Sequence, residues 1–201
     1  MRDFFQQSDR IYFDESPCSG FSMDKDLDLD WFLEFRNRAG ISNTISASQI
    51  IQNLKVLLPD GSMKNGGALF FGEKPEQFLE TAVIRCVAFE GNNKTNIVDD
   101  KTYGGPLIRQ YEQAMHWLKG KLDVRYEITG GGPRIEHWEI PETAFKEAII
   151  NALSHRDYYD KGAKITIELF DNRVEISNPG GLTSAIPPSE FGTKSHSRNP
   201  L

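Results

Sequence analysis

The stretch IPETAFKEAIINALSHRDYYDKGAKITIELFDNRVEISNPGGL, residues 140–182, contains a helical pattern followed by two strand patterns. Pro141 suits the first turn of a helix, where its missing N–H costs little, and Glu142 adds negative charge at the positive helix end. Apolar residues then recur at helical spacing and predict one buried face. They are Ala144, Phe145, Ala148, Ile149, Ala152 and Leu153. We therefore expect a helix that closes at residues 155–157.

Two short strands are predicted after this helix, at residues 165–169 and 174–176, because apolar and polar residues alternate there. Asp171 and Asn172 between them suit a tight hairpin turn. The second strand runs into residues 178–181, Asn-Pro-Gly-Gly. Glycine has no side chain, so a ligand can approach the backbone closely at this turn.

Glu147 and Asn151 are four residues apart on the predicted helix, so they share one ridge beside the buried face, and Ser154 continues that ridge. One interpretation is a polar ridge on a half-exposed helix. The other is a ligand site, which the strand pair and the glycine turn favour. The sequence alone gives these two interpretations about equal weight.

A carboxylate and a carboxamide on a helix, followed by a glycine turn, resemble the nucleotide site of the GHKL ATPases. That group includes gyrase, the mismatch-repair proteins and the sensor histidine kinases. Its helix reads E-x-x-x-N, which Glu147 and Asn151 match. In the family the Glu activates or orients the attacking water, and the Asn holds the Mg²⁺ that bridges the phosphates of ATP. The resemblance therefore implies that Glu147 is catalytic and that Asn151 binds both metal and cofactor.

The next motif of that family is D-x-G-x-G, whose Asp reads the adenine amino group. The equivalent stretch here begins with Asn178, so an Asn replaces the Asp and one glycine is out of step. An Asn oxygen can still accept a hydrogen bond from an amino group, without the charge. The resemblance implies cofactor-binding roles for Asn178, Gly180 and Gly181.

The sequence resembles one divergent branch of the family more closely. It is the C-terminal part of bacterial proteins labelled RecG-like ATP-dependent helicases or transcriptional regulators. They read P-x-x-A-x-x-E-x-x-x-N-A-x-x-H-R-D-Y, then a strand pair, then N-P-G-G-L and R-N-P-L. The matching residues here are Pro141, Ala144, Glu147, Asn151, Ala152, residues 155–158, 178–182 and 198–201, with further likeness at 66–72 and 103–107. The resemblance covers roughly residues 50–201.

In related proteins a Schlafen/AlbA-type domain, thought to bind nucleic acid, precedes this region, and the rest of the ATPase-like fold follows it. We therefore expect a fragment whose contact with DNA is made through domains outside it. A net charge of −6 argues against broad phosphate-backbone binding by this piece itself.

Further candidate residues flank the site. His155, Arg156 and Asp157 either close the helix near its negative end or form a polar wall of the nucleotide pocket. A protein-kinase interpretation of this tripeptide fails, because no D-F-G follows it. Lys194 and Arg198 belong to a stretch that could form a partial lid over a nucleotide, although its Ser, Pro and Gly content favours a flexible loop.

The predicted fold is α/β (α+β), a mixed sheet with helices packed on it, whose C-terminal part resembles a truncated GHKL (Bergerat-type) fold. We expect three parts: residues 1–60, an extended segment and helical collar; 61–140, an α/β domain; and 141–201, an incomplete GHKL-like segment. In the first part helices are predicted at 28–38 and 46–57, with Ser48 as a candidate cap. This pair could be a helix-turn-helix reader, but it lacks a basic face, so a packing collar is favoured.

In the second part the sequence predicts strands at 68–71 and 82–89, a helical turn at 75–79 and an edge strand at 97–99. A helix follows residue 106, and a hairpin spans 122–140 around three glycines. No Lys-Ser/Thr follows these glycines at Walker spacing, so a phosphate-binding P-loop is rejected.

Cys18 and Cys86 form no C-x-x-C pair, which suggests a reducing cytoplasm, and no apolar run is long enough to span a membrane. The sequence supports two functions. The first is a nucleotide-binding regulatory module of a DNA-associated transcriptional regulator, with ATP and Mg²⁺ as its ligands. Weak ATPase activity of the full-length protein and homo-oligomerisation are both compatible with this function. The second is a non-catalytic interaction module that keeps the fold without the ligand. A helicase motor ranks third, because no Walker motif is present.

Overall fold

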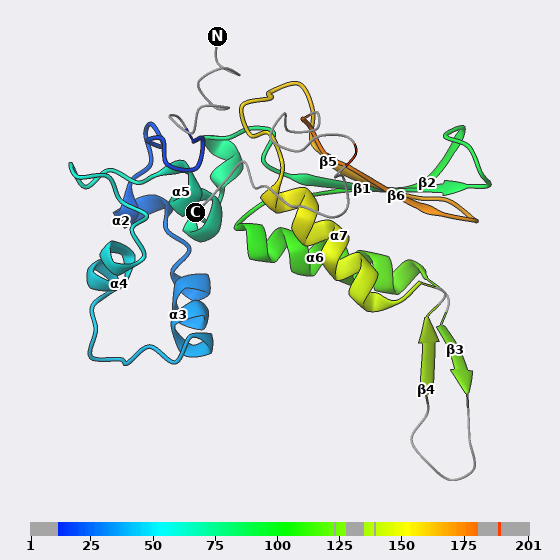
Figure 1. The fold of residues 1–201 in the computed structure, drawn as a ribbon, viewed down its shortest axis with the longest axis horizontal. Coiled ribbons are helices and arrows are strands. Elements are labelled where there is room, and N and C mark those ends of the chain that lie inside the picture. The colour runs from blue at the N-terminus through cyan, green and yellow to red at the C-terminus, as the bar shows by residue number, and fades with distance from the viewer. Residues whose placement is uncertain (1–11, 123, 128–134, 139, 181–188, 190–201) are drawn as a thin grey trace.

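The computed structural model describes residues 12–122, 124–127, 135–138, 140–180 and 189. Figure 1 shows a group of short helices beside a sheet that two long helices cover. The helices are α2 (Met23–Asp26), α3 (Leu29–Arg38), α4 (Ala47–Asn53), α5 (Asn65–Phe71), α6 (Leu107–Lys121) and α7 (Glu142–Ser154), with a 3₁₀ turn at Pro75–Gln77. The strands are β1 (Ile84–Glu90), β2 (Asn96–Tyr103), β3 (Val124–Glu127), β4 (Ile135–Trp138), β5 (Ile165–Leu169) and β6 (Val174–Ser177).

Four of these strands form a mixed sheet in the order β2-β1-β5-β6. β1 is antiparallel to β2 and parallel to β5, and β5 is antiparallel to β6. The connection between β1 and β5 contains α6, the separate β3–β4 hairpin and α7. The predicted α+β class with a mixed sheet is therefore confirmed. The domain boundary expected at residue 140 separates β1 from β5 along the chain, although these two strands are hydrogen-bonded neighbours in one sheet.

The main core lies between the sheet and the α6–α7 pair, which lie side by side on one face of it (Figure 1). Ile84, Cys86 and Ala88 of β1 belong to this core, together with residues of both helices. Val87 and Phe89 alternate with them and pack with Phe170 instead. β1 is thus buried on both faces, which explains why its sequence reads as a continuous apolar run.

The short N-terminal helices have a core of their own, rich in aromatic rings. Trp31, Phe32 and Phe71 are almost fully buried in it. The indole N–H of Trp31 donates a hydrogen bond of 2.8 Å to the Phe70 carbonyl and so joins α3 to α5. The apolar faces of these helices are thus turned toward each other.

The strand predicted at residues 68–71 is wrong, because these residues form the last part of helix α5. A short apolar run cannot be assigned to helix or strand from periodicity alone. α5 is buried on most of its circumference, so it lacks the polar stripe that marks a surface helix. Gly67 lets it approach Val56 and Met63 closely.

Helix α4 is shorter than predicted, and its cap is Ser46 rather than Ser48. The Ser46 hydroxyl accepts the Gln49 N–H, as an N-cap does. The helix stops before Lys55, whose φ of 58° lies in the left-handed region. The other predicted elements, including the hairpins β3–β4 and β5–β6, are confirmed. The three-glycine turn lies outside the described residues.

Candidate functional site

Helix α7 carries the predicted catalytic and metal-binding residues. Phe145 and Ile149 anchor it in the main core, while Glu147 and Asn151 are exposed on another face. At its first turn, Glu142 forms ion pairs of 2.9 Å with Lys119 of α6 and 2.8 Å with Lys146. The hydrogen bonds from Lys146 and Lys119 lower the pKa of the Glu142 carboxyl. α7 is thereby fixed against α6 and the sheet, with its polar ridge turned to solvent.

The glycine turn follows β6 and lies against the chain segment that leaves α7. Pro179 is buried, whereas Asn178 and Gly180 are exposed, and Gly180 has a φ of 107° that favours glycine. The Asp157 N–H donates a hydrogen bond of 3.1 Å to the Pro179 carbonyl. Two stretches separated by a whole hairpin are therefore joined directly at the backbone.

His155 and Asp157 both stabilise the end of the helix. His155 is the C-cap, and its N–H donates to the Asn151 carbonyl over 2.9 Å. The Asp157 carboxylate accepts the Tyr159 N–H over 2.9 Å, which closes a local turn. Within the described residues, the Nδ1 atom of His155 is buried and has no hydrogen-bond partner. Both residues therefore make helix-end contacts, and their place in a nucleotide pocket stays a prediction.

Arg156, also predicted to bind the cofactor, is directed into the protein instead. Its side chain is 1% exposed. The guanidinium donates to the carbonyl and hydroxyl of Thr81 and to the Ala163 carbonyl, and it lies 5.0 Å from the centre of the Tyr158 ring. Burial lowers the pKa of this guanidinium. Because both terminal nitrogens of the guanidinium donate to the chain, we assign Arg156 to structure rather than to ligand contact.

Three further predicted residues, Gly181, Lys194 and Arg198, lie outside the described residues. Within the described part of the chain, no group of three His, Cys, Asp or Glu side chains is close enough to hold a metal ion. Mg²⁺ in nucleotide sites takes one or two protein ligands and completes its shell with phosphate oxygens and water. An exposed amide such as Asn151 fits that role, but it would not hold the metal without a nucleotide.

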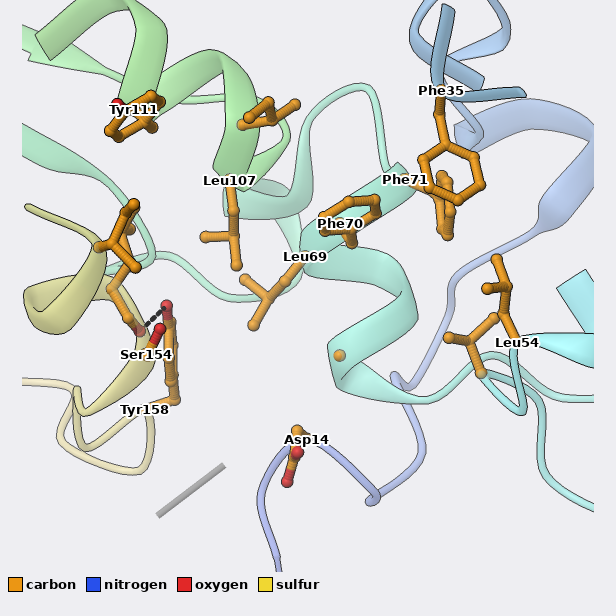
Figure 2. A pocket seen from close by; sticks show the side chains of 15 residues that line it. Asp14, Phe35, Leu54, Leu69, Phe70, Phe71, Leu107, Tyr111, Ser154 and Tyr158 are labelled. Atoms are coloured by element: carbon orange, nitrogen blue, oxygen red, sulfur yellow. Dashed lines mark hydrogen bonds between the residues drawn. The ribbon is translucent and has the colours of Figure 1, made fainter. Parts of the chain in front are cut away.

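The sequence analysis missed a cavity of about 560 Å³ beside α7. Its described lining comes from several segments that are far apart in sequence (Figure 2). Ile150, Leu153 and Ser154 are the contribution of α7. No local motif could reveal such a cavity, because it forms only when separate helices pack. The sequence contains one weak sign of the cavity: Ile150 is apolar but lies outside the predicted buried face of the helix.

Comparisons with known proteins bear on the C-terminal part. Residues 162–201 match the family described as "Putative ATP-dependent DNA helicase recG C-terminal". No curated protein matches the chain. Among solved structures, the DIP2311 protein from Corynebacterium diphtheriae is similar, with a TM-score of 0.72 and 16% sequence identity.

That similarity covers 98% of this chain and 39% of the DIP2311 chain, so this chain spans about two fifths of its length. At this identity the likeness shows a shared fold. None of the helices in the described residues is long and apolar enough to cross a membrane. The C-terminal residues 162–201 are thus similar to the ATPase-like C-terminal region of RecG-type proteins.

Proposed function

We propose that this chain is a nucleotide-binding regulatory module, with ATP bound between α7 and the turn at residues 178–181. The observation that carries the proposal is the hydrogen bond from the Asp157 N–H to the Pro179 carbonyl. It joins the end of the helix that bears Glu147 and Asn151 to the glycine turn. The match of residues 162–201 to a family of ATP-dependent proteins supports the same assignment.

Each polar group has a role in this proposal. Asn151 would hold the Mg²⁺ that accompanies the nucleotide, and that ion would neutralise phosphate charge. Glu147 orients a water molecule toward the terminal phosphate. Asn178 accepts a hydrogen bond from the adenine amino group. We assign contact with the phosphates to Lys194 and Arg198, which lie outside the described residues.

With a net charge of −6, this chain is a poor match for the DNA backbone. We propose that DNA is bound by other domains of a cytoplasmic transcriptional regulator, and that nucleotide binding here changes how those domains act. Binding rather than turnover is the function we assign to this piece, with Gly180 and Gly181 approaching the ligand.

A second candidate is an interaction module that binds no nucleotide. Asn178 favours it, because this residue lacks the charge of the Asp in the D-x-G-x-G motif. Arg156 favours it as well, because its charge serves the packing of the loop after α7. These observations make a direct binding measurement necessary.

Isothermal titration of the chain with ATP and Mg²⁺ tests the proposal. We expect saturable heat for the wild type and for Thr143→Ala, an exposed control on the same helix. Asn151→Ala should bind at least about tenfold more weakly, the loss of roughly 1.4 kcal/mol that one polar contact to a charged ligand provides. If the wild type gives no saturable heat, the interaction module is favoured instead.

A further inference from the structure

We propose that β2 is a dimerisation edge, at which two copies of this chain pair in antiparallel fashion and join their sheets. The proposal goes beyond nucleotide binding and does not depend on it. β2 lies at one end of the strand order and has eight residues, whereas β6 at the other end has four. In the described part of the chain, β1 is the only strand that pairs with β2. The outer N–H and C=O groups of such an edge strand are free to pair with another chain.

Exposed apolar side chains mark this edge. Ile97 and Val98 are 55% and 62% exposed. Val98 has no partner on β1, because the register between the two strands shifts at this point. The other edge strand, β6, carries no large apolar side chain that is exposed to this degree. Pairing at β2 would therefore remove apolar surface from water, which favours association.

Symmetry limits how two copies of β2 can pair. Antiparallel pairing of identical strands places a two-fold axis perpendicular to the sheet, so one central residue faces itself. Facing side chains lie on the same face of the joined sheet, so every other pair is symmetric about that residue. Only the register centred on Asp100 pairs oppositely charged residues of β2, because Asp99 then faces Lys101 of the second copy. In that register Val98 faces Thr102, a pair of β-branched side chains that suits a sheet.

The charges of β2 fit this register. Lys101 forms no ion pair in the described part of the chain, so its ammonium group can reach Asp99 of the second copy. Asp99 lies 2.9 Å from Lys121 in its own copy and can accept a second cation. Asp100 faces its own equivalent, but the Arg85 guanidinium donates to both of its oxygens, at 3.0 and 2.5 Å. The like charges at the axis are thereby compensated, and the flanking pairs attract.

The joined sheet leaves both candidate nucleotide sites accessible. Helices α6 and α7 cover one face of the sheet (Figure 1), and a two-fold axis perpendicular to the sheet keeps the helices of both copies on that face. The glycine turn follows β6, at the end of the strand order away from β2. A ladder of about five residues per copy is a small interface, so we expect a weak dimer, with a dissociation constant on the order of 10–100 μM.

Sedimentation velocity over chain concentrations from about 5 to 500 μM tests the proposal. We expect a reversible monomer–dimer equilibrium for the wild type. Lys101→Glu places a negative charge opposite Asp99 and should weaken dimerisation at least about tenfold. Lys25→Glu makes the same change of charge at an exposed position of α2 and should leave the dissociation constant unchanged. A wild type that stays monomeric throughout would overturn the proposal and leave the edge to a strand of another protein.

A second pair of variants tests the apolar contact. Val98→Lys introduces a charge at the edge and should abolish the dimer. Leu33→Lys replaces a side chain of α3 that is 51% exposed, and should have no effect. Far-ultraviolet circular dichroism confirms that each variant is folded. Unchanged dimerisation in folded Val98→Lys would contradict the proposed edge.

Disulfide formation between copies tests the register. In Asp100→Cys the two introduced thiols face each other across the axis, within reach of a disulfide, and mild oxidation should link the copies. Thr102→Cys places its two thiols roughly 13 Å apart, because each faces Val98 instead, and should give no link. Cys18 and Cys86 are buried and do not compete. Equal linking of both variants, or none in Asp100→Cys, would overturn this register.

Discussion

The Arg156 guanidinium joins three places in the chain: Thr81 before β1, Ala163 before β5, and the Tyr158 ring. A buried arginine whose terminal nitrogens donate to the chain holds its neighbours in one geometry, and loss of those contacts leaves their carbonyls buried without partners. This residue therefore fixes the loop that leads from α7 to the sheet and sets the position of Asp157 against the glycine turn.

Arg156→Lys tests that role. Lysine keeps the charge but cannot reproduce the planar fork of donors, so we expect the free energy of unfolding to fall by about 2–4 kcal/mol. Urea denaturation measures it. Lys161→Arg, an exposed substitution nearby, should change the value by less than about 0.5 kcal/mol. If Arg156→Lys also lowers the free energy of unfolding by less than about 0.5 kcal/mol, the structural role of Arg156 is contradicted.

The two cysteines give a second prediction for single residues. Burial raises the pKa of the Cys18 thiol to about 11 and that of Cys86 to about 12. The thiolate is the reactive form, so both thiols should be inert to a disulfide reagent at pH 8 in the folded protein. We expect both to react fully after unfolding in guanidinium. Rapid reaction of Cys86 in the folded state would mean that the β1 core is open.

At the scale of elements, glycines in two helices should respond oppositely to alanine. A Cβ at Gly67 of α5 would overlap with the Met63 sulfur and lie 2.9 Å from Val56 Cβ. A Cβ at Gly120 of α6 meets nothing within 4 Å. We expect Gly67→Ala to destabilise by about 1–3 kcal/mol and Gly120→Ala to stabilise by up to about 1 kcal/mol. Thermal unfolding compares them, and a stable Gly67→Ala would show that α5 packs less closely.

Capping of α4 gives a matched pair of serines. The Ser46 hydroxyl accepts the Gln49 N–H, so Ser46→Ala should cost about 1 kcal/mol. Ser48 lies inside the helix, where alanine has the higher helical propensity, so Ser48→Ala should be neutral or slightly stabilising. Chemical denaturation distinguishes the two, and a larger loss at Ser48 would restore the sequence-based assignment.

These elements also show how far the sequence could predict the structure. α7 and the β5–β6 hairpin were predictable because each has one buried face and a distinct period. α5 was mistaken for a strand because burial on most sides removes the polar period. The side chain of Arg156 could not be placed from its motif, since its partners Thr81 and Ala163 are brought to it only by the tertiary fold.

At the scale of the whole molecule, the parallel pairing of β1 with β5 decides where the candidate site lies. It spans a connection that contains α6, α7 and a separate hairpin, and no local pattern specifies such a pairing. The pairing brings the chain that leaves α7 next to the turn that follows β6, where the Asp157 N–H donates to the Pro179 carbonyl. The cavity beside α7 likewise depends on packing between separate helices, so sequence periodicity did not predict it.

The central claim is that α7 and the glycine turn act as one nucleotide-binding surface. The most direct measurement is a ¹H–¹⁵N correlation spectrum of the chain, titrated with ATP and Mg²⁺. We predict that the backbone amides of Asn151, Asp157 and Gly180 shift together along one saturable curve, while those of β2 stay in place. If ATP leaves all three amides unshifted at saturating concentration, or shifts only residues elsewhere, the claim is wrong.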